Sequence, residues 1–175
     1  LWERATVIGL DPEEMEGWRE FDLSAELNAR YDFPVFLGND ATCACGAELV
    51  FGTANAPPDY LHFYLAYFVG GGVVLNGSLF KGINGNAGAV GPFPIVSATG
   101  AMQQLVDVAS LNGLERRLCA LGHDGAEMWQ TPPRWDFPPA ALNDWLAEAA
   151  PALAHTILAT ISIIDFQSIV IDGHM

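Results

Sequence analysis

The sequence predicts an α/β fold in which strands and helices alternate along the chain. Short apolar runs, typical of buried strands, recur between longer segments that have the apolar spacing of helices. The chain has 175 residues, of which 51% are hydrophobic, and this is enough for one core or somewhat more. A glycine-rich stretch at 70–95 also contains the strongest short hairpin signal, Asn76-Gly77.

The first half of the chain predicts a helix, a strand and a second helix. The pair Asp11-Pro12 offers a cap and a first turn for a helix over 11–30. A short apolar run predicts a buried strand at 35–37, and small residues after it predict a helix at 41–51. A loop with two prolines follows at 54–59.

The second half predicts strands first and helices after them. Its expected elements are strands at 61–69 and 72–75, a short strand after the Asn76-Gly77 turn, helices at 100–110 and 114–121, an irregular segment at 123–139, a long helix at 140–162 and a strand at 166–171. The long helix is expected to bend near Pro151, because proline lacks the hydrogen-bond donor and crowds the preceding turn.

Composition argues against a nucleic-acid surface and against a membrane span. With 21 acidic and 7 basic residues, the formal net charge is -14, and DNA binding depends on basic side chains that neutralise phosphates. The one basic pair, Arg116-Arg117, is expected on a solvated helix face. No run reaches the roughly 20 apolar residues that a membrane span needs, and we see no signal peptide. The three cysteines are expected to be reduced thiols, which indicates a cytoplasmic protein.

Two segments are candidates for chemistry, and each also has a purely structural interpretation. The pair Asn39-Asp40 follows the predicted strand at 35–37, and the carboxyl ends of strands are where α/β proteins bind ligands. Asp40 is therefore a candidate general base, although Asp also commonly caps a helix. The glycines of 70–95 either allow a ligand to approach the backbone or serve only the fold of a hairpin.

Taken together and in this order, these segments resemble the ROK family of repressors and sugar kinases. Members of that family have a strand ending in Asn-Asp, a Leu-Gly-Thr-Gly-hydrophobic-Gly-x-Gly strand, an Asn-Gly hairpin and a Gly-x-Ala-Gly-Glu-x-Gly-His loop. Here Asn39-Asp40 matches the first motif, the run from Gly70 to Gly77 matches the later part of the second, and the run from Gly85 to Gly88 begins the last. The resemblance extends from about Pro34 to Ser110 and more faintly to the strand before Gly173.

The chain departs from the kinases of this family at positions that matter for function. Where they have Gly-Thr-Gly to cradle phosphate, this chain has Ala66-Tyr67-Phe68, and bulky rings exclude phosphate from backbone amides. In the sugar-contacting loop, the usual Glu is Ala89 and the usual His is Pro92.

The structural zinc of the family is also expected to be absent. The zinc-binding Cys-x-Cys-Gly-x-x-Gly-Cys run corresponds here to residues 97–104, which contain neither Cys nor His. Zinc requires about four nitrogen or sulfur ligands, so we expect no metal at this position.

The resemblance implies the actin-like, ribonuclease-H-like ATPase fold of sugar kinases, with two domains around a cleft and this chain as part of it. Residues 1–53 would end the smaller N-terminal domain, and 59–175 would belong to the larger, incomplete C-terminal domain. Ligand-binding residues would be Asn39, Asp40, Gly88 and Ala89. Residues Gly70, Gly71 and Gly72 would be the remnant of a phosphate loop. The resemblance also implies a homodimer or a higher homo-oligomer.

Two functions from different classes follow. The first is the effector-sensing domain of a ROK-type transcriptional regulator, which binds a sugar or sugar derivative, needs no cofactor and meets DNA only through a domain outside these residues. The second is a sugar kinase that uses ATP and Mg²⁺, with Asp40 as the base that deprotonates the sugar hydroxyl. The lost Gly-Thr-Gly, Glu, His and zinc ligands favour the sensor. The retention of Asp40 favours the kinase, although a sensor can also keep Asp40 to hydrogen-bond a ligand hydroxyl.

Overall fold

A computed structural model of the chain describes residues 10–52, 57–97, 99–130 and 136–173. It forms two compact units, residues 1–38 and 39–175. The first unit holds two short helices, α1 (Pro12–Glu16) and α2 (Leu23–Arg30). The second unit holds the sheet and the residues of the candidate site.

The second unit is built on a mixed, four-stranded sheet with the order β3-β2-β1-β6. Its strands are β1 (Tyr60–Leu65), β2 (Gly70–Leu75), β3 (Ser78–Phe80) and β6 (Ser168–Gly173). Strand β1 pairs antiparallel with β2 and parallel with β6, and β3 pairs antiparallel with β2. Between β2 and β3, Asn76 and Gly77 have φ values of 52° and 67°, which confirms the predicted tight hairpin turn.

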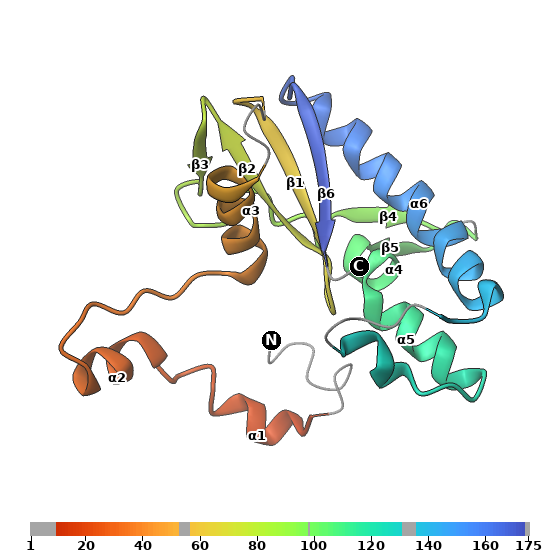
Figure 1. Cartoon of the computed structure of the whole chain (residues 1–175), viewed down its shortest axis with the longest axis horizontal. Coiled ribbons are helices and arrows are strands. Elements are labelled where there is room, and N and C mark those ends of the chain that lie inside the picture. Colours follow the sequence, from red (N-terminus) through yellow and green to blue (C-terminus); the bar gives the residue numbers. More distant parts are fainter. Residues whose placement is uncertain (1–9, 53–56, 98, 131–135, 174–175) are drawn as a thin grey trace. The chain divides into compact units, whose positions relative to one another are not determined.

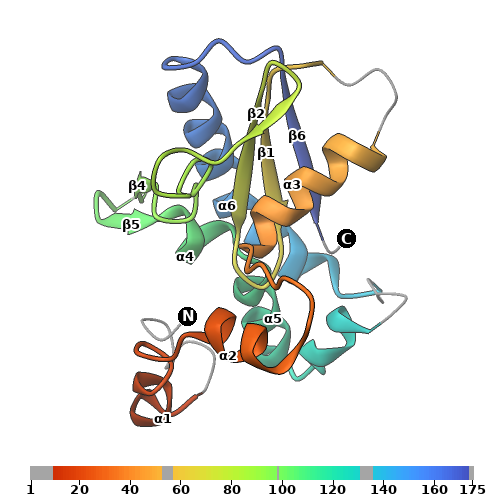
Figure 2. The ribbon, with the colours of Figure 1, turned by 90° about the vertical axis from the view of Figure 1, so that its left-hand side faces the viewer.

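Helices cover both faces of this sheet, as Figures 1 and 2 show. One face carries α3 (Asp40–Phe51), and the other carries α4 (Leu105–Ala109), α5 (Leu111–Ala120) and α6 (Pro139–Ile161). A separate two-stranded hairpin consists of β4 (Pro94–Val96) and β5 (Met102–Gln104), and a 3₁₀ helix, η2, spans Gly125–Trp129. Among the described helices, none combines the length and the apolarity that crossing a membrane requires.

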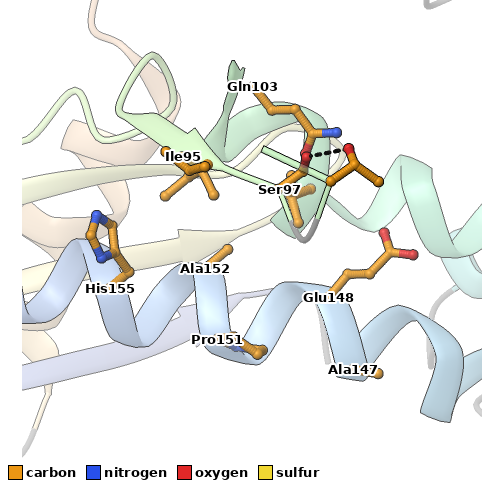
Figure 3. A pocket seen from close by; sticks show the side chains of 11 residues that line it. Ile95, Ser97, Gln103, Ala147, Glu148, Pro151, Ala152 and His155 are labelled. Atoms are coloured by element: carbon orange, nitrogen blue, oxygen red, sulfur yellow. Dashed lines mark hydrogen bonds between the residues drawn. The ribbon is translucent and has the colours of Figure 1, made fainter. Parts of the chain in front are cut away.

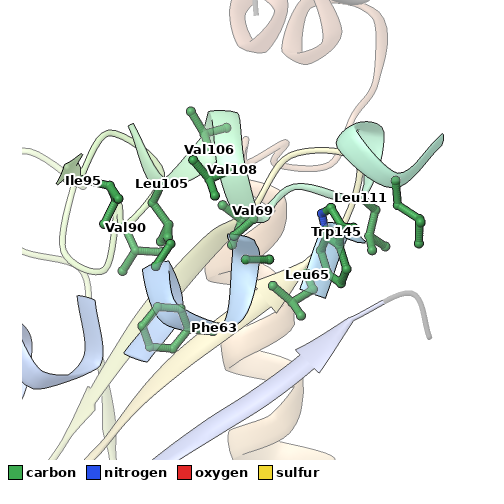
Figure 4. Packing of buried hydrophobic residues seen from close by; sticks show 14 of the residues in the cluster. Phe63, Leu65, Val69, Val90, Ile95, Leu105, Val106, Val108, Leu111 and Trp145 are labelled. Carbon is green, nitrogen blue, oxygen red and sulfur yellow. The ribbon is translucent and has the colours of Figure 1, made fainter. Parts of the chain in front are cut away.

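The main hydrophobic core lies between β1 and the helices α4 to α6 (Figure 4). Leu61, Phe63 and Leu65 point to this side because side chains alternate along a strand. Trp145 of α6 is buried in the same core, and its indole N–H donates to the carbonyl of Ser110 at 3.2 Å. The core therefore fixes the sheet against α4 to α6, whereas α3 packs on the other face with Cys45 against Tyr60 and Val74.

The buried strand predicted at 35–37 is wrong. These residues have no regular structure, and the side chain of Phe36 is 87% exposed. A strand needs a partner for its backbone, but here the N–H of Val35 donates to Asn28 Oδ1 at 2.9 Å and its carbonyl accepts from Asn28 Nδ2 at 3.2 Å. A side chain thus takes the place of a neighbouring strand. Consequently, Asn39 and Asp40 lie at the start of α3 and do not follow a strand.

Two predicted helices are also divided. The helix predicted at 11–30 becomes α1 and α2, because α1 ends at its cap Gly17 and the side chain of Asp22 caps a new helix by accepting from the N–H of Ala25. The helix predicted at 100–110 becomes β5 and α4, because Met102 and Gln103 pair with Val96 and Ile95. In contrast, α6 continues through Pro151 as one helix.

The chain divides into the two units between residues 38 and 39, whereas the sequence predicts a domain boundary at 53–59. Helix α3, which we assigned to the smaller domain, packs on β2 of the second unit. Half of the predicted loop at 54–59, residues 54–56, lies outside the described residues. The division of the whole protein into domains stays a prediction.

Candidate functional site

The glycines of β2 allow α3 to approach the sheet very closely. A Cβ atom added to Gly70 would lie 2.6 Å from the Cβ of Ala41, and one added to Gly72 would lie 2.4 Å from the Cβ of Cys45. Both distances are too short for real atoms, so this packing requires glycine. It brings the first turn of α3, with Asn39 and Asp40, onto the start of β2.

The opposite face of β2 is occupied by the turn at Gly88. A Cβ on Gly71 would lie 2.4 Å from the carbonyl oxygen of His62 and 2.9 Å from that of Gly88. Gly88 has a φ of 78°, which favours glycine, and the N–H of Val90 donates to its carbonyl at 2.7 Å. The neighbouring Ala89 is exposed.

The predicted motifs therefore meet at one strand. The start of α3 lies on one face of Gly70–Gly72, and the Gly88 turn lies on the other. Strand β3 pairs only with Val73–Leu75, so among the described strands only β1 pairs with the glycine run. Gly70 is partly exposed at this edge, whereas Gly71 and Gly72 are buried between the α3 side and the Gly88 side. We take this edge as the candidate ligand site.

Asn39, and not Asp40, caps α3. Asn39 Oδ1 accepts from the N–H of Thr42 at 3.1 Å, whereas Asp40 is the first residue of the helix and its Oδ1 accepts from the N–H of Ala41 at 2.9 Å. Both side chains belong to exposed residues. The Asp40 carboxylate therefore keeps acceptor capacity for a ligand hydroxyl, next to the positive end of the helix dipole.

The turn between β1 and β2 is held by the start of α5. The carbonyls of Ala66 and Tyr67 accept from the N–H groups of Leu111 and Asn112 at 3.0 and 3.3 Å, and the N–H of Val69 donates to Ser110 Oγ at 2.9 Å. This turn is the place at which kinases of the resembled family carry Gly-Thr-Gly. The amide of Val69 is thus already occupied within the fold.

Aromatic rings fill the surroundings of the same turn. The rings of Tyr67 and Phe68 meet edge to face at 5.1 Å, and the ring of Tyr67 lies 5.5 Å from that of Trp129 in η2. Phe68 also packs against the main core. Trp129 was not predicted to take part in this site, because only the fold brings η2 to the turn. The β1–β2 turn therefore carries bulky side chains, and hydrogen bonds to the start of α5 hold its backbone in place.

The region expected to have lost zinc is the hairpin of β4 and β5. Its loop is stabilised by Ser97, whose Oγ lies 2.9 Å from Thr99 Oγ1 and accepts from the N–H of Ala101 at 3.0 Å. Within the described ranges, no cluster of three or more His, Cys, Asp or Glu side chains could hold a metal ion. Hydrogen bonds of Ser97 thus hold this loop together, and the absence of zinc stays a prediction.

A row of buried polar groups that the sequence did not reveal lies near α3, on the same face of the sheet. Within the described structure, Tyr60 Oη, both ring nitrogens of His62 and Ser168 Oγ have no hydrogen-bond partner. Burial lowers the pKa of His62, while Asp172, 3.8 Å away, and Glu48 oppose this change. Burial, together with Cys45 and Glu48, raises the pKa of Tyr60 to about 12. His62 and Tyr60 are thus held neutral in the fold.

A model of the ROK family matches residues 8–128, and the chain belongs to this family. Its fold is accordingly the actin-like fold of sugar kinases, of which this chain forms a part.

Similar proteins include both kinases and repressors. The glucokinase of Halalkalibacterium halodurans is 35% identical over 106 residues, which are 57% of this chain and 32% of the glucokinase. The xylose repressor of Bacillus subtilis is 32% identical over 78 residues, which are 45% of this chain and 20% of the repressor. The crystal structure of a ROK hexokinase from Thermus thermophilus has a TM-score of 0.61 and 27% identity, over 89% of this chain and 55% of the hexokinase.

The chain thus spans 32% or less of these two curated relatives and 55% of the solved hexokinase. Family membership alone does not choose between a kinase and a repressor. That choice depends on the residues of the site.

Proposed function

We propose that this chain is part of a ROK-type transcriptional regulator, in which it senses a sugar or sugar derivative without phosphorylating it. The sugar binds at the free edge of Gly70–Gly72, where Asn39 and Asp40 approach from one face and Gly88 and Ala89 from the other. Ligand binding favours one arrangement of the protein, and a DNA-binding domain outside these residues responds to that arrangement. On this proposal the protein is cytoplasmic and a homodimer or higher homo-oligomer.

The observation that carries the proposal is the β1–β2 turn. A phosphate-binding turn needs bare backbone with free N–H groups. Here Tyr67 and Phe68 surround the turn with rings, and the amide of Val69 donates to Ser110. Two differences in the sugar-contacting loop also favour a sensor: Ala89 replaces the usual Glu, and Pro92 replaces the usual His.

The alternative is a sugar kinase with Asp40 as general base, and one observation favours it. The Asp40 carboxylate is exposed beside the glycine run and has capacity to accept a proton from a sugar hydroxyl. ATP and Mg²⁺ would then be required. A regulator can use the same carboxylate simply as a hydrogen-bond acceptor.

The two functions differ in ATP consumption. We expect the full-length protein to show negligible sugar-dependent ADP formation in a coupled assay with Mg²⁺, across hexoses, pentoses and N-acetylhexosamines. The bulky β1–β2 turn is the physical reason. The control variant is Asp124→Asn, because Asp124 is an exposed carboxylate at the N-cap of η2. A robust rate of ADP formation that Asp40→Asn abolishes and Asp124→Asn preserves would establish the kinase instead.

A further inference from the structure

A cavity of about 620 Å³ lies between the β4–β5 hairpin and helix α6 (Figure 3). Its volume falls within the range of small-molecule sites. It contains none of the residues that we assign to sugar sensing. The residues that line it are Ile95, Val96, Ser97, Thr99, Gln103, Val108, Ala147, Glu148, Pro151, Ala152 and His155.

The hairpin contributes hydroxyl and amide groups. Ser97 and Thr99 share a hydrogen bond of 2.9 Å and line the same wall, with Gln103 beside them (Figure 3). A hydroxyl both donates and accepts, and a primary amide does the same through separate atoms. This wall therefore suits ligand groups, such as hydroxyls, that can both donate and accept hydrogen bonds.

Helix α6 contributes an unusual acceptor. Pro151 lies inside the helix and has no N–H to donate to the carbonyl of Ala147, one turn earlier. Both residues line the cavity. The backbone carbonyl of Ala147, a residue that lines the cavity, thus lacks its usual helical donor.

The electrostatics of the cavity favour a neutral occupant. Glu148 is already paired with Arg117, whose Nη2 lies 2.7 Å from Glu148 Oε2. Among the residues that line the cavity there is no Lys or Arg to bind an anion, and the one imidazole, that of His155, lies edge to face with the ring of Phe93 at 6.2 Å. Ile95, Val108 and Ala152 are buried and give the cavity an apolar surface beside its polar groups.

We propose that this cavity is a second small-molecule site, separate from the sugar-sensing site, and that it binds a neutral polyhydroxylated compound. Hydroxyls of such a compound satisfy the hairpin side chains and the Ala147 carbonyl, while its C–H groups contact the apolar surface. A carboxylate in the ligand finds no Lys or Arg among the lining residues, so it loses hydration without gaining an ionic partner and binds more weakly. Linear polyols and cyclic sugars share this chemistry, so the experiment uses one of each.

The test uses the full-length protein carrying Asp40→Ala, which weakens sugar binding at the proposed sensing site. The comparison of cavity variants below then reports on the cavity, whether or not the proposed sensing site exists. Ligand-observed NMR titrations compare D-sorbitol, D-glucose and the anion D-gluconate. We expect saturable binding of sorbitol, glucose or both, and binding of gluconate at least about tenfold weaker. Ala147→Phe, which fills the cavity, should abolish the binding, whereas Ala150→Phe, at another exposed alanine that does not line the cavity, should preserve it.

A milder variant tests the carbonyl itself. Pro151→Ala restores the missing N–H, so it should raise the melting temperature and weaken polyol binding by roughly three- to tenfold, the value of about one hydrogen bond. Three results would overturn the proposal: no saturable binding of either neutral probe in the millimolar range, equal loss in Ala147→Phe and Ala150→Phe, or gluconate binding as tightly as glucose.

Discussion

Replacing Asp40 by Ala is expected to weaken binding of the effector sugar by about 5- to 150-fold while leaving the fold intact. A site built around a ligand hydroxyl loses roughly 1 to 3 kcal/mol when one hydrogen-bond partner is removed. Because Asn39 is the helix cap, loss of the Asp40 carboxylate removes only its bond to the N–H of Ala41 and a favourable helix-dipole interaction. The latter is worth about 0.3 to 1 kcal/mol.

Calorimetric titration with the inducing sugar, run beside thermal melts, measures both effects. Asp124→Ala is the matched control, since Asp124 is also an exposed carboxylate that accepts from a backbone N–H near a helix start. This control should leave affinity unchanged. Undiminished affinity in Asp40→Ala together with a lower melting temperature would assign Asp40 a purely structural role.

Replacing Gly71 by Ala is expected to lower the free energy of unfolding by about 3 kcal/mol or more, at the upper end of the cost of overpacking a core. The added Cβ would lie 2.4 Å from the His62 carbonyl oxygen and 2.9 Å from that of Gly88, and both are backbone atoms that cannot rotate away. For a chain of this size, the melting temperature should fall by roughly 6 to 12 °C.

Gly46→Ala is the control for this prediction. A Cβ at Gly46 would make ordinary contact with Leu79 at 3.6 Å, so alanine should be neutral or stabilise α3 by about 0.5 to 1 kcal/mol. Denaturant unfolding measures the free energy of unfolding of both variants. A loss in Gly71→Ala alone shows that close packing requires glycine at this position, whereas a loss in both shows that any Gly→Ala change destabilises the protein. If Gly71→Ala were as stable as the wild type, the close approach of the Gly88 turn to β2 would be contradicted.

The sequence predicted local structure well where local chemistry decides it. The Asn76-Gly77 turn, the helix beginning near Asp40 and the long helix α6 follow from turn propensity, capping and apolar spacing. The predicted strand at 35–37 failed because a strand exists only with a partner, and Val35 bonds to Asn28 instead. The division of 100–110 was missed for the same reason, since β5 forms only by pairing with β4.

The candidate site was predictable in its parts but not in its arrangement. The motifs indicated Asn39, Asp40, the glycine run and Gly88, yet only the fold shows that α3 and the Gly88 turn lie on opposite faces of β2. Nothing in the sequence indicated that Trp129 would join Tyr67 at the β1–β2 turn, or that Tyr60 and His62 would be buried without hydrogen-bond partners among the described residues. Contacts between residues far apart in sequence decide each of these features.

The most direct test of the proposed function is whether a sugar alone controls DNA binding by the full-length protein. DNA fragments retained by the protein are selected from a random pool, and their binding is then followed by fluorescence anisotropy during titration with sugars, without ATP. We predict that at least one sugar shifts DNA affinity about 5-fold or more, as expected for typical coupling between sites, and that Asp40→Ala abolishes the shift but not DNA binding. Failure to select any DNA, or DNA binding that no sugar alters, would contradict the sensor.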